Sequence, residues 1–437
     1  MAKYTRQDIL DIIEQEDIGF IRLQFTDISG RLKNMATTVK QIDKILDGHY
    51  KFDCKAIDGF SGTGYEELFL VPDLDTFVIF PWRPQNGKVA RFLCDVIKPD
   101  GTPFAGDSRY ILKKVAREAE SMGFSFNTAI KNEFFLFDIG DNGEPANYSS
   151  EKGGYFDVGP ADCGENARRD MVLYLSDMDI DVETSYHSDE AAQHMLDLGY
   201  APPLGMADSI MTTRLVVRTV AKRHGLHATF MPKPRENVKG SGAHYIFSLE
   251  KDGRNIFTDQ SDSIGISQDG YYFMAGILKH IAGMSLITNP IVNSYKRLVP
   301  GYLAPVTIGW SSTDASSLIR LTSIGQDGGR IILRSPDGAA NPYLVIALCL
   351  AAGMDGIKNK TKPPVCMEKM TEKEIHNAEV LPRTLHEAVN HFKKDSFIHE
   401  ILGSHIPGQM VKAKEQEWSE YCRQVTLWET EHYLSSI

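Results

Sequence analysis

Several common features are missing from this chain, and each absence excludes a class of protein. The six cysteines form no CxxC or Cys/His spacing, so neither a disulfide framework nor a structural zinc site is expected. The longest apolar stretch, from Tyr343 to Met354, is too short to span a bilayer. The opening MAKYTRQDILDIIEQ lacks the apolar run of a signal peptide. We therefore expect a cytoplasmic protein with reduced, packed cysteines and no membrane partner.

The chain is also short of basic residues. It has 47 Lys and Arg against 58 Asp and Glu, a formal charge of -11, whereas nonspecific nucleic-acid binding requires a basic surface. Nucleic acid is therefore not expected as a partner. With 437 residues, 42% of them hydrophobic, and no low-complexity tract or internal repeat, the sequence predicts a soluble globular protein of two domains.

The N-terminal part reads as a small β-rich domain. Between Gly19 and Val96, short apolar runs such as FIRLQFTDI and VARFLCDVI alternate with turn signals such as Asn86-Gly87. Beyond the loop PDGTPFAGDSR, apolar residues recur at helical spacing from Leu112 to Met122, and the extended stretch SFNTAIKNEFFLF follows. A helix that leads into a strand predicts the start of a larger α/β domain.

Further helices are predicted toward the C-terminus. Glu165 to Met178 carries an apolar stripe, and the stretch from Ile180 to Ser185 that follows reads as extended. Asn341 is a good N-cap residue, Pro342 suits the first helical position, and the apolar segment after it predicts a buried helix. The segment 413–434 predicts outer helices that pack through tryptophans.

Long segments throughout the chain resemble bacterial glutamine synthetase of type I, the ATP-dependent glutamate-ammonia ligase of nitrogen metabolism. The resemblance rests on KNEFFLF, GGYFDVGPADCGENARRD, HGLHATFMPKP, GSGAHYIFSL, NPIVNSYKRLVPGY, RSPDGAANPYL and AAGMDGIKNK. These segments are long, keep the family's order and cover nearly the whole chain. The chain is therefore identified as a divergent member of this family.

The resemblance implies an α+β fold. Residues 1–103 would form a β-grasp domain, and residues 104–437 a catalytic-type α/β domain around a curved antiparallel sheet. It further implies a dodecamer of two stacked hexameric rings, with each active site between neighbouring subunits. The family's chemistry forms γ-glutamyl phosphate from ATP and glutamate, and ammonia then attacks it, with Mg or Mn screening the phosphoryl group.

Most of the family's metal-ligand positions hold other residues in this chain. Divalent Mg and Mn need several oxygen ligands, so losses should be cumulative. Of the family's ligands, Glu133 and His244 are retained. The other ligand positions are occupied by Lys131, Ser188, Met195 and Ile332.

Other family positions are replaced as well. The glutamate that closes over the site and helps deprotonate ammonium is replaced by Leu303, which cannot accept a proton. An Arg-Asn-Arg run appears as Thr313-Asp314-Ala315, which removes a guanidinium that would stabilise phosphoryl charge. On the nucleotide side, Lys239 and Ile246 replace an asparagine and a histidine.

The residues that remain favour anion binding. The resemblance assigns catalytic positions to Asp53, Arg297 and Arg320, with Asp53 contributed by the neighbouring subunit. It assigns substrate-binding positions to Gly240, His244, Arg297 and Arg334, and nucleotide-binding positions to Ser248, Arg320 and Arg330. Because the carboxylates are lost while the arginines persist, a small anionic or amino-acid ligand is expected.

Several site residues also allow simpler interpretations. Glu133 would be a structural carboxylate paired with a cation, and His244 a loop histidine bonded to the backbone. We hypothesise that Lys131 pairs with Glu133 and replaces a lost metal electrostatically. Asp189 and Glu190 follow Ser188, but a one-residue shift in a strand reverses the face, and Glu190 would need a bulge.

Two functions follow from these positions. The first is an oligomeric binding, regulatory or scaffolding paralogue that lacks normal ligase activity and binds no cofactor tightly, alone or in mixed rings with a true glutamine synthetase. The alternative is an active ligase that uses ATP with Mg or Mn and makes a γ-glutamyl amide from glutamate and ammonia or an amine. Leu303 would make room for an apolar nucleophile.

Overall fold

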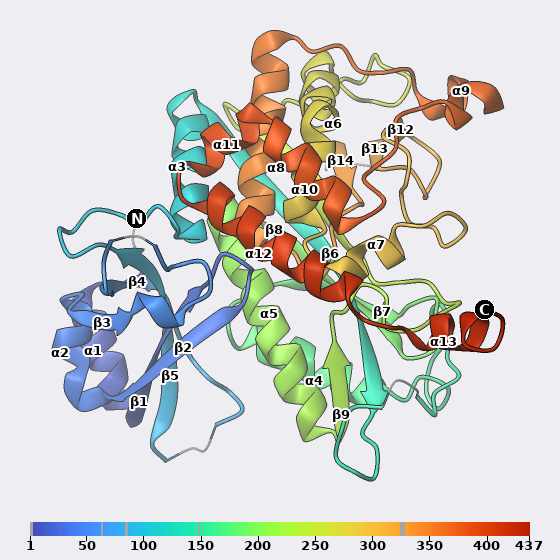
Figure 1. The fold of residues 1–437 in the computed structure, drawn as a ribbon. Helices are drawn as coiled ribbons and strands as arrows, with labels where there is room; N and C mark the ends of the chain where they lie inside the picture. The colour runs from blue at the N-terminus through green and yellow to red at the C-terminus, as the bar shows by residue number, and fades with distance from the viewer. Residues whose placement is uncertain (1–2, 63, 84–85, 147–148, 324–327) are drawn as a thin grey trace.

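The structure is a computed structural model that describes residues 3–62, 64–83, 86–146, 149–323 and 328–437. Two β-sheets organise the chain, one in the N-terminal part and one in the larger remainder (Figure 1). The N-terminal sheet has five strands in the order β2-β1-β5-β4-β3. Its elements are α1 (Arg6–Gln15), β1 (Ile18–Thr26), β2 (Leu32–Thr38), α2 (Ile42–Leu46), β3 (Tyr50–Asp53), β4 (Glu67–Ile79) and β5 (Lys88–Ile97).

The larger sheet has nine strands, with the main order β12-β13-β14-β10-β6-β8-β7. Neighbouring strands on this path run antiparallel except β12 and β13, which are parallel, so the sheet is mixed at one edge. Its strands are β6 (Phe124–Asp138), β7 (Val182–His187), β8 (Gln193–Ala201), β9 (Leu226–Thr229), β10 (Ala243–Lys251), β11 (Arg254–Asn255), β12 (Trp310–Ser311), β13 (Ile319–Ser323) and β14 (Gly329–Leu333).

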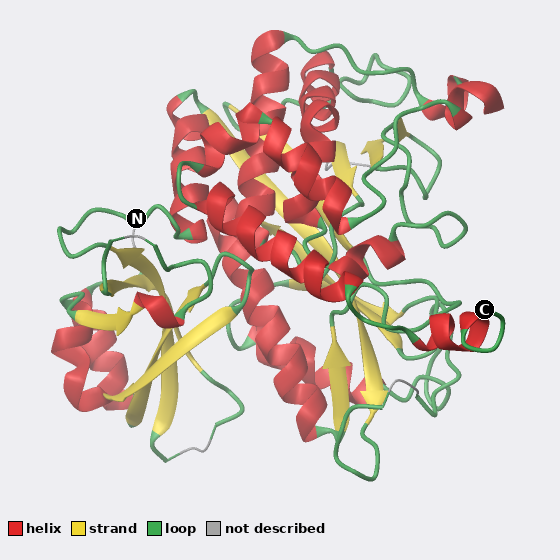
Figure 2. Cartoon of the chain, in the orientation of Figure 1, coloured by secondary structure: helices red, strands yellow, loops and turns green. Residues whose placement is uncertain are grey.

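Helices accompany the larger sheet, and Figure 2 shows several of them gathered over it. They are α3 (Ser108–Ser121), α4 (Glu165–Ser176), α5 (Pro203–Arg223), α6 (Gln268–Thr288), α7 (Val292–Arg297), α8 (Pro342–Asn359), α9 (Glu372–His376), α10 (Leu385–Lys394), α11 (Ser396–Leu402), α12 (Ile406–Cys422) and α13 (Leu427–Tyr433). The mixture of two sheets with separate helices confirms the predicted α+β fold.

Helix α8 lies at the centre of the core, as its sequence predicts. The Asn341 side chain caps it by accepting a hydrogen bond from the Tyr343 backbone N–H, and Pro342 occupies the first turn. Because α8 is apolar on nearly every side, it can be buried all round, and it packs against α3, α5 and α6. The helix runs to Asn359, beyond the predicted end at Met354.

Arg109 on α3 ties the two parts of the molecule together. Its guanidinium bonds to Asp95 of β5 at 2.6 Å, to Asp73 of β4 at 2.7 Å and to Asp208 of α5 at 2.9 Å. Asp208 in turn accepts a hydrogen bond from the buried Tyr343 hydroxyl at 2.6 Å. A buried arginine with three carboxylate partners is well compensated, so these bonds fix the N-terminal sheet against the core.

The other local predictions agree with the structure within a few residues, except that Trp428, one of the tryptophans expected to pack, is 56% exposed. The helix predicted from Leu112 is α3, the extended segment after it is β6, and the helix from Glu165 is α4. The six cysteines form no disulfide, and Cys163 and Cys422 are exposed rather than packed. Among the described residues, no helix is long and apolar enough to cross a membrane.

Candidate functional site

A narrow cleft of about 60 Å³ opens where β6, β10, the ends of α7 and β14, and the loops beside them meet. Its lining includes five retained family positions: Glu133, Gly240, His244, Arg297 and Arg334. The remaining lining residues are Asp189, Gln193, Lys239, Tyr302, Leu303 and Ala304. Residues that are far apart in the sequence thus meet in one place.

Glu133 is held at the cleft by strand geometry and by one backbone donor. In β6 it lies opposite Met195 of β8, and its Oε2 accepts a 2.6 Å hydrogen bond from the Gly242 N–H. Burial raises the pKa of Glu133, although this hydrogen bond and the nearby Arg297 and Arg334 act in the opposite direction. Because only one carboxylate oxygen has this bond, Glu133 keeps acceptor capacity toward the cleft.

His244 reaches the cleft from β10, where it lies opposite Lys131 of β6. Burial lowers the pKa of His244 well below its usual value, and the cations Arg334, Arg297 and Lys131 lower it further. The imidazole is therefore neutral at neutral pH. A neutral ring nitrogen can ligate a metal or accept a hydrogen bond from a substrate.

Arg297 and Arg334 differ in how many hydrogen-bond acceptors their guanidinium groups have. Arg297 is buried, and its guanidinium donates to the carbonyls of Ser335 at 2.7 Å and Arg334 at 3.0 Å. For Arg334, no described residue accepts a hydrogen bond from the buried Nη1. Burial lowers the pKa of Arg334, and the cation Arg297 adds to this effect. An incompletely bonded guanidinium in a cleft is suited to binding a carboxylate or phosphate.

Glycines allow the loop before β10 to approach these side chains. A Cβ on Gly240 would lie 2.2 Å from the Pro232 carbonyl oxygen, and a Cβ on Gly242 would lie 2.5 Å from a nitrogen of Arg297. At Gly240 a side chain would force the backbone to move, and at Gly242 it would displace the Arg297 guanidinium. Gly240 therefore contributes by leaving space and backbone atoms at the cleft.

The structure contradicts the predicted pairing between Lys131 and Glu133. The Lys131 ammonium instead lies 2.5 Å from Oδ2 of Asp197 on β8, which also accepts a hydrogen bond from Thr184 at 2.8 Å. The reason is the register of the sheet, which places Asp197 directly opposite Lys131. Lys131 is thus neutralised locally and does not replace a metal beside Glu133.

Asp189 lies in the cleft, contrary to the sequence argument that disfavoured it. That argument assumed an extended strand, but β7 ends at His187, and residues 188–192 form a tight loop in which Ala192 has a φ of +68°. Strand alternation does not apply to a loop, so Asp189 can face the cleft, where it accepts a 2.9 Å bond from Lys239. Glu190 is not among the lining residues, and its carboxylate accepts a hydrogen bond from the Lys239 backbone N–H.

The substituted ligand positions have become part of the packing. Ser188 is buried and its backbone N–H donates to the Gln193 carbonyl, while the Met195 sulfur accepts from the Tyr186 hydroxyl. Ile332 of β14, at a metal-ligand position, lies opposite Ile246 of β10, at a nucleotide-side position, so two apolar side chains meet on that side of the sheet. These replacements make that side of the sheet less polar.

The other predicted site residues do not line this cleft. Asp53 ends β3 in the N-terminal part, where its side chain caps the following turn by accepting from the Lys55 N–H. Arg320 lies on β13 opposite Ile332, and its charge acts on Arg334. Ser248 is buried on β10, and Arg330 stacks over the Tyr200 ring. Lys239, which replaces a nucleotide-side asparagine of the family, lines the cleft, and so do Gln193, Tyr302 and Ala304, which were not predicted as site residues.

One group of three described side chains could hold a metal, and it lies outside the cleft. The ligand atoms of Glu151, His187 and His194 are within 4.8 Å of one another and are buried. Glu151 lies 3.0 Å from His187 Nε2 and 3.5 Å from His194 Nε2. Burial lowers the pKa of His194, which favours the neutral ring that a metal requires.

Comparison with known proteins gives full-length matches. Residues 17–99 match the family model "Glutamine synthetase, beta-Grasp domain", and residues 105–433 match "Glutamine synthetase, catalytic domain". A glutamine synthetase of Clostridium saccharobutylicum is 49% identical over 441 residues and covers 100% of both chains. One from Staphylococcus aureus is 46% identical over 438 residues, covering 99% of this chain and 98% of its own.

Solved structures agree with these matches. The solved structure named "GmaS/ADP complex-Conformation 1" has a TM-score of 0.88 and 29% identity, covering 98% of this chain and 99% of its own. The Plasmodium falciparum glutamine synthetase has a TM-score of 0.88 at 24% identity, with 99% of each chain covered, and shows the fold.

These full-length relatives contradict the prediction of a scaffolding paralogue without ligase activity. That prediction counted family positions one by one and treated residues 188–192 as a strand. It therefore missed Asp189, which joins Glu133 and His244 at the cleft.

Proposed function

Because this chain belongs to the glutamine synthetase family, we propose that it is an active ATP-dependent ligase that joins glutamate to ammonia or a small amine. The observation that carries the proposal is the cleft, where an incompletely bonded Arg334 lies with Arg297, Glu133, Asp189 and His244. Full-length relatives named glutamine synthetase support it. The similar GmaS/ADP complex supports a nucleotide as co-substrate.

The proposed reaction has two steps. In the first, a γ-carboxylate oxygen of glutamate attacks the γ-phosphorus of ATP, and ADP leaves with the electron pair of the broken bond. In the second, the nitrogen of the amine attacks the γ-carbonyl carbon, and inorganic phosphate leaves. The products are a γ-glutamyl amide, ADP and phosphate.

Arg334 and Arg297 would stabilise the anionic groups in both steps. Arg334 has donor capacity for a carboxylate or phosphoryl oxygen, and Arg297 adds a second positive charge while it fixes the backbone at Arg334 and Ser335. Asp189 would accept the proton that the amine loses, because it is a carboxylate that lines the same cleft as Leu303, the residue that replaces the family's proton acceptor. Gly240 supplies space and backbone atoms for the substrate.

The residues at the cleft fit a magnesium or manganese ion that arrives with ATP. Magnesium is commonly bound by one or two carboxylates together with substrate phosphates and water. Glu133 and Asp189 offer two carboxylates, and His244 offers a neutral nitrogen. Such an ion would screen the charge of the transferring phosphoryl group.

Leu303 favours a small alkylamine as nucleophile in addition to ammonia. This residue lines the cleft beside Ala304, and an apolar wall can bury a methyl group but offers nothing to ammonium. Leu303 also has a φ of +56°, a strained conformation for a branched residue that is typical of functional loops.

The proposal includes the family's assembly and domain division. We propose a dodecamer of two hexameric rings in which Asp53 reaches the cleft of a neighbouring subunit, and a domain boundary between residues 103 and 104. Asp53 is exposed at the end of β3 and does not line the cleft of its own chain, which is compatible with this role. Size-exclusion chromatography with light scattering would give the subunit number.

The experiment that tests the function is the trapping of the acyl phosphate. The purified protein would be incubated with ATP, magnesium and glutamate, and hydroxylamine would be added as the nucleophile. We expect γ-glutamyl hydroxamate in proportion to the ADP released, and roughly tenfold to a hundredfold slower formation of both products with the Arg334→Met variant. Release of ADP without hydroxamate, or of neither compound, would contradict the proposal.

A further inference from the structure

A second and larger cavity lies apart from the cleft. Its volume is about 950 Å³, and it opens between the β1–β2 turn, α5, α7 and α12. None of its lining residues is shared with the cleft. Pockets of roughly 300–1,000 Å³ hold small organic ligands in proteins. The size of this cavity therefore suits a metabolite.

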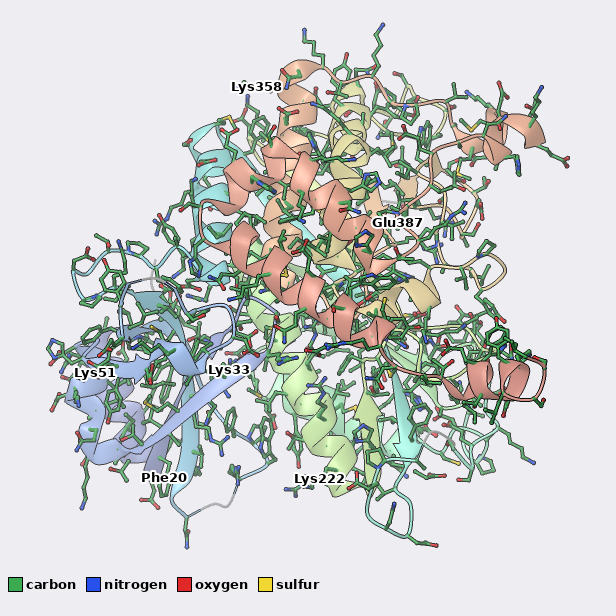
Figure 3. The ribbon with its side chains drawn as sticks, viewed as in Figure 1. Phe20, Lys33, Lys51, Lys222, Lys358 and Glu387 are labelled. Carbon is green, nitrogen blue, oxygen red and sulfur yellow. The ribbon has the colours of Figure 1, made fainter. Side chains whose placement is uncertain are left out.

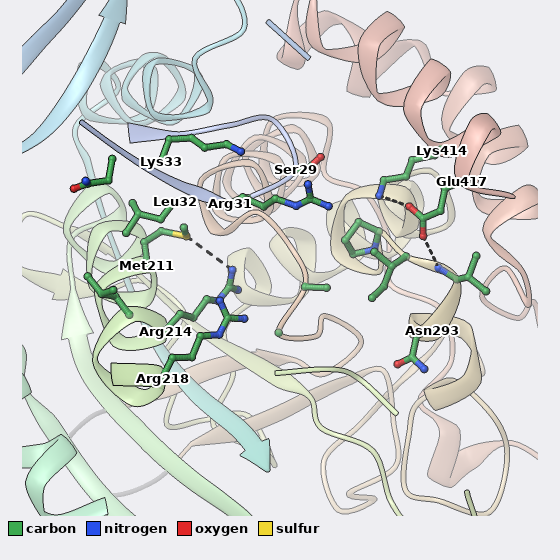
Figure 4. A pocket seen from close by; sticks show the side chains of 18 of the residues that line it. Ser29, Arg31, Leu32, Lys33, Met211, Arg214, Arg218, Asn293, Lys414 and Glu417 are labelled. Carbon is green, nitrogen blue, oxygen red and sulfur yellow. Dashed lines mark hydrogen bonds and ion pairs between the residues drawn. The ribbon is translucent and has the colours of Figure 1, made fainter. Parts of the chain in front are cut away.

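The lining of the cavity is strongly basic. Its positively charged residues are Arg22, Arg31, Lys33, Arg214, Arg218, Lys296 and Lys414, whereas the acidic residue among its lining is Glu417. They come from both parts of the molecule: Lys33 lies on β2 where the N-terminal part faces the remainder (Figure 3). Across the cavity from Lys33, the side chains of Arg214 and Arg218 extend from α5 into it (Figure 4). For a chain with a net charge of -11, this concentration of cations is unusual.

Part of this positive charge is neutralised within the protein. Lys414 bonds to Glu417 at 2.8 Å, Lys33 lies 3.2 Å from Asp27, and Arg31 lies 3.4 Å from Asp58. These cations require no further partner.

The other four basic residues have no carboxylate partner among the described residues. Arg22, Arg218 and Lys296 lie over the rings of Phe80, Phe230 and Tyr421, at 5.6, 5.6 and 5.3 Å from the centroids. Contacts of this kind leave the charge of the cation in place. The fourth residue, Arg214, is the most buried of the set.

Arg214 and Gln24 show that the cavity contains buried polar groups that lack partners. Arg214 is 7% exposed, and its Nη2 donates a hydrogen bond to the Ala340 carbonyl at 3.0 Å. No described residue accepts from its Nε. Gln24 is 2% exposed, and no described donor reaches its Oε1. Buried polar atoms normally have partners, and both of these atoms are closed to solvent, so they mark desolvated polar groups in the wall of the cavity and not direct contacts to a ligand.

Arg214 and Arg218 form one binding unit. They are four residues apart on α5 and therefore lie on the same face of the helix. Burial lowers the pKa of Arg214, and the charge of Arg218 lowers it further. Two cations held together at an energetic cost would be stabilised by an anion between them.

We propose that this cavity binds a small organic molecule with two or more negative charges on phosphate or carboxylate groups. Arg214 and Arg218 bind its charged end, and Lys296 and Arg22 add positive charge around it. The apolar side chains of Leu32, Met211 and Leu215 bury its organic part. Because the cavity shares no lining residue with the cleft, the ligand is a regulator rather than a substrate. Phosphate and carboxylate share the geometry that guanidinium groups recognise, so the chemistry of the site admits both.

The test is calorimetric titration of the full chain with inorganic pyrophosphate and, separately, with succinate. We expect at least one of the two to bind, and Arg218→Met to weaken that binding by about tenfold or more, as the loss of a charged hydrogen bond predicts. The matched control is Arg117→Met, which removes an exposed arginine of α3 far from the cavity and leaves binding unchanged.

A second variant separates the cavity from the cleft. Arg334→Met removes the guanidinium of the cleft, and binding at the cavity should survive it. Binding of pyrophosphate alone identifies phosphate as the recognised group, and binding of succinate alone identifies carboxylate. The proposal is overturned if neither probe binds, if Arg218→Met binds as well as the unaltered chain, or if Arg334→Met abolishes binding.

Discussion

Replacing Arg334 by methionine should lower activity and raise stability at the same time. Arg334 lies in the cleft with its Nη1 buried and no hydrogen-bond acceptor among the described residues. In the free protein this donor is desolvated without compensation, which costs about 1–3 kcal/mol for a buried polar group. Attraction to Glu133 offsets part of that cost. We therefore expect the free variant to be about 1 kcal/mol more stable.

The effect on catalysis has the opposite sign. A hydrogen bond to a charged group contributes about 1.5–3 kcal/mol, and about 1.4 kcal/mol corresponds to a factor of ten. The variant should therefore lose roughly tenfold to a hundredfold or more in kcat/KM. Methionine is of similar length and apolar, so the cleft should remain packed.

Urea unfolding and coupled ADP release would measure both quantities on the same preparations. Arg254→Met, an exposed arginine on β11, is the matched control and should change neither quantity. The reasoning would be refuted if Arg334→Met kept normal kcat/KM, or if it lost activity only because it unfolded more readily.

Three further predictions concern the other cleft residues. Asp189→Asn should lower kcat about a hundredfold with little change in the KM for glutamate, because the proton acceptor is lost; equal kcat values would exclude this role, and Asp189→Glu should retain more activity. Leu303→Glu should shift the preference from methylamine toward ammonia by about tenfold in the ratio of kcat/KM values, since a charge replaces an apolar contact; an unchanged ratio would remove Leu303 from the specificity argument. The pKa of His244 is lower in the folded chain than in the unfolded chain. Above about pH 6.5 the imidazole is neutral in both states, and as the pH falls below that value the unfolded state binds the proton first, which lowers the free energy of unfolding. Between pH 7.5 and 5.5 the unaltered chain should lose about 1 kcal/mol more stability in urea melts than His244→Gln, and equal losses would argue against a neutral buried imidazole.

Much of the fold was predictable because local signals and packing agree. The cap at Asn341 and the apolar segment after it predict α8, and the helical spacing from Leu112 predicts α3. The extended stretch SFNTAIKNEFFLF predicts a strand, which is β6. The parallel pairing of β12 with β13 was not predictable, because such short strands carry no sequence pattern of their own.

The site was only partly predictable. Glu133 and His244 were assigned through the family resemblance, and both line the cleft from neighbouring strands. The partner of Lys131 depends on the register between β6 and β8, and that register is set by long-range packing. The position of the Asp189 side chain depends on where β7 ends and how the following loop turns, and no local sequence pattern determines either.

The most direct test of the central claim is a search for the amide product. The purified chain would be incubated with glutamate, ATP, magnesium and either ¹⁵N-ammonium or methylamine, and the products followed by mass spectrometry alongside ADP release. We predict labelled glutamine or γ-glutamylmethylamide in equal amount to ADP, and roughly tenfold to a hundredfold slower formation of both in Arg334→Met. Absence of amide and of glutamate-dependent ADP release with either nucleophile would contradict the account.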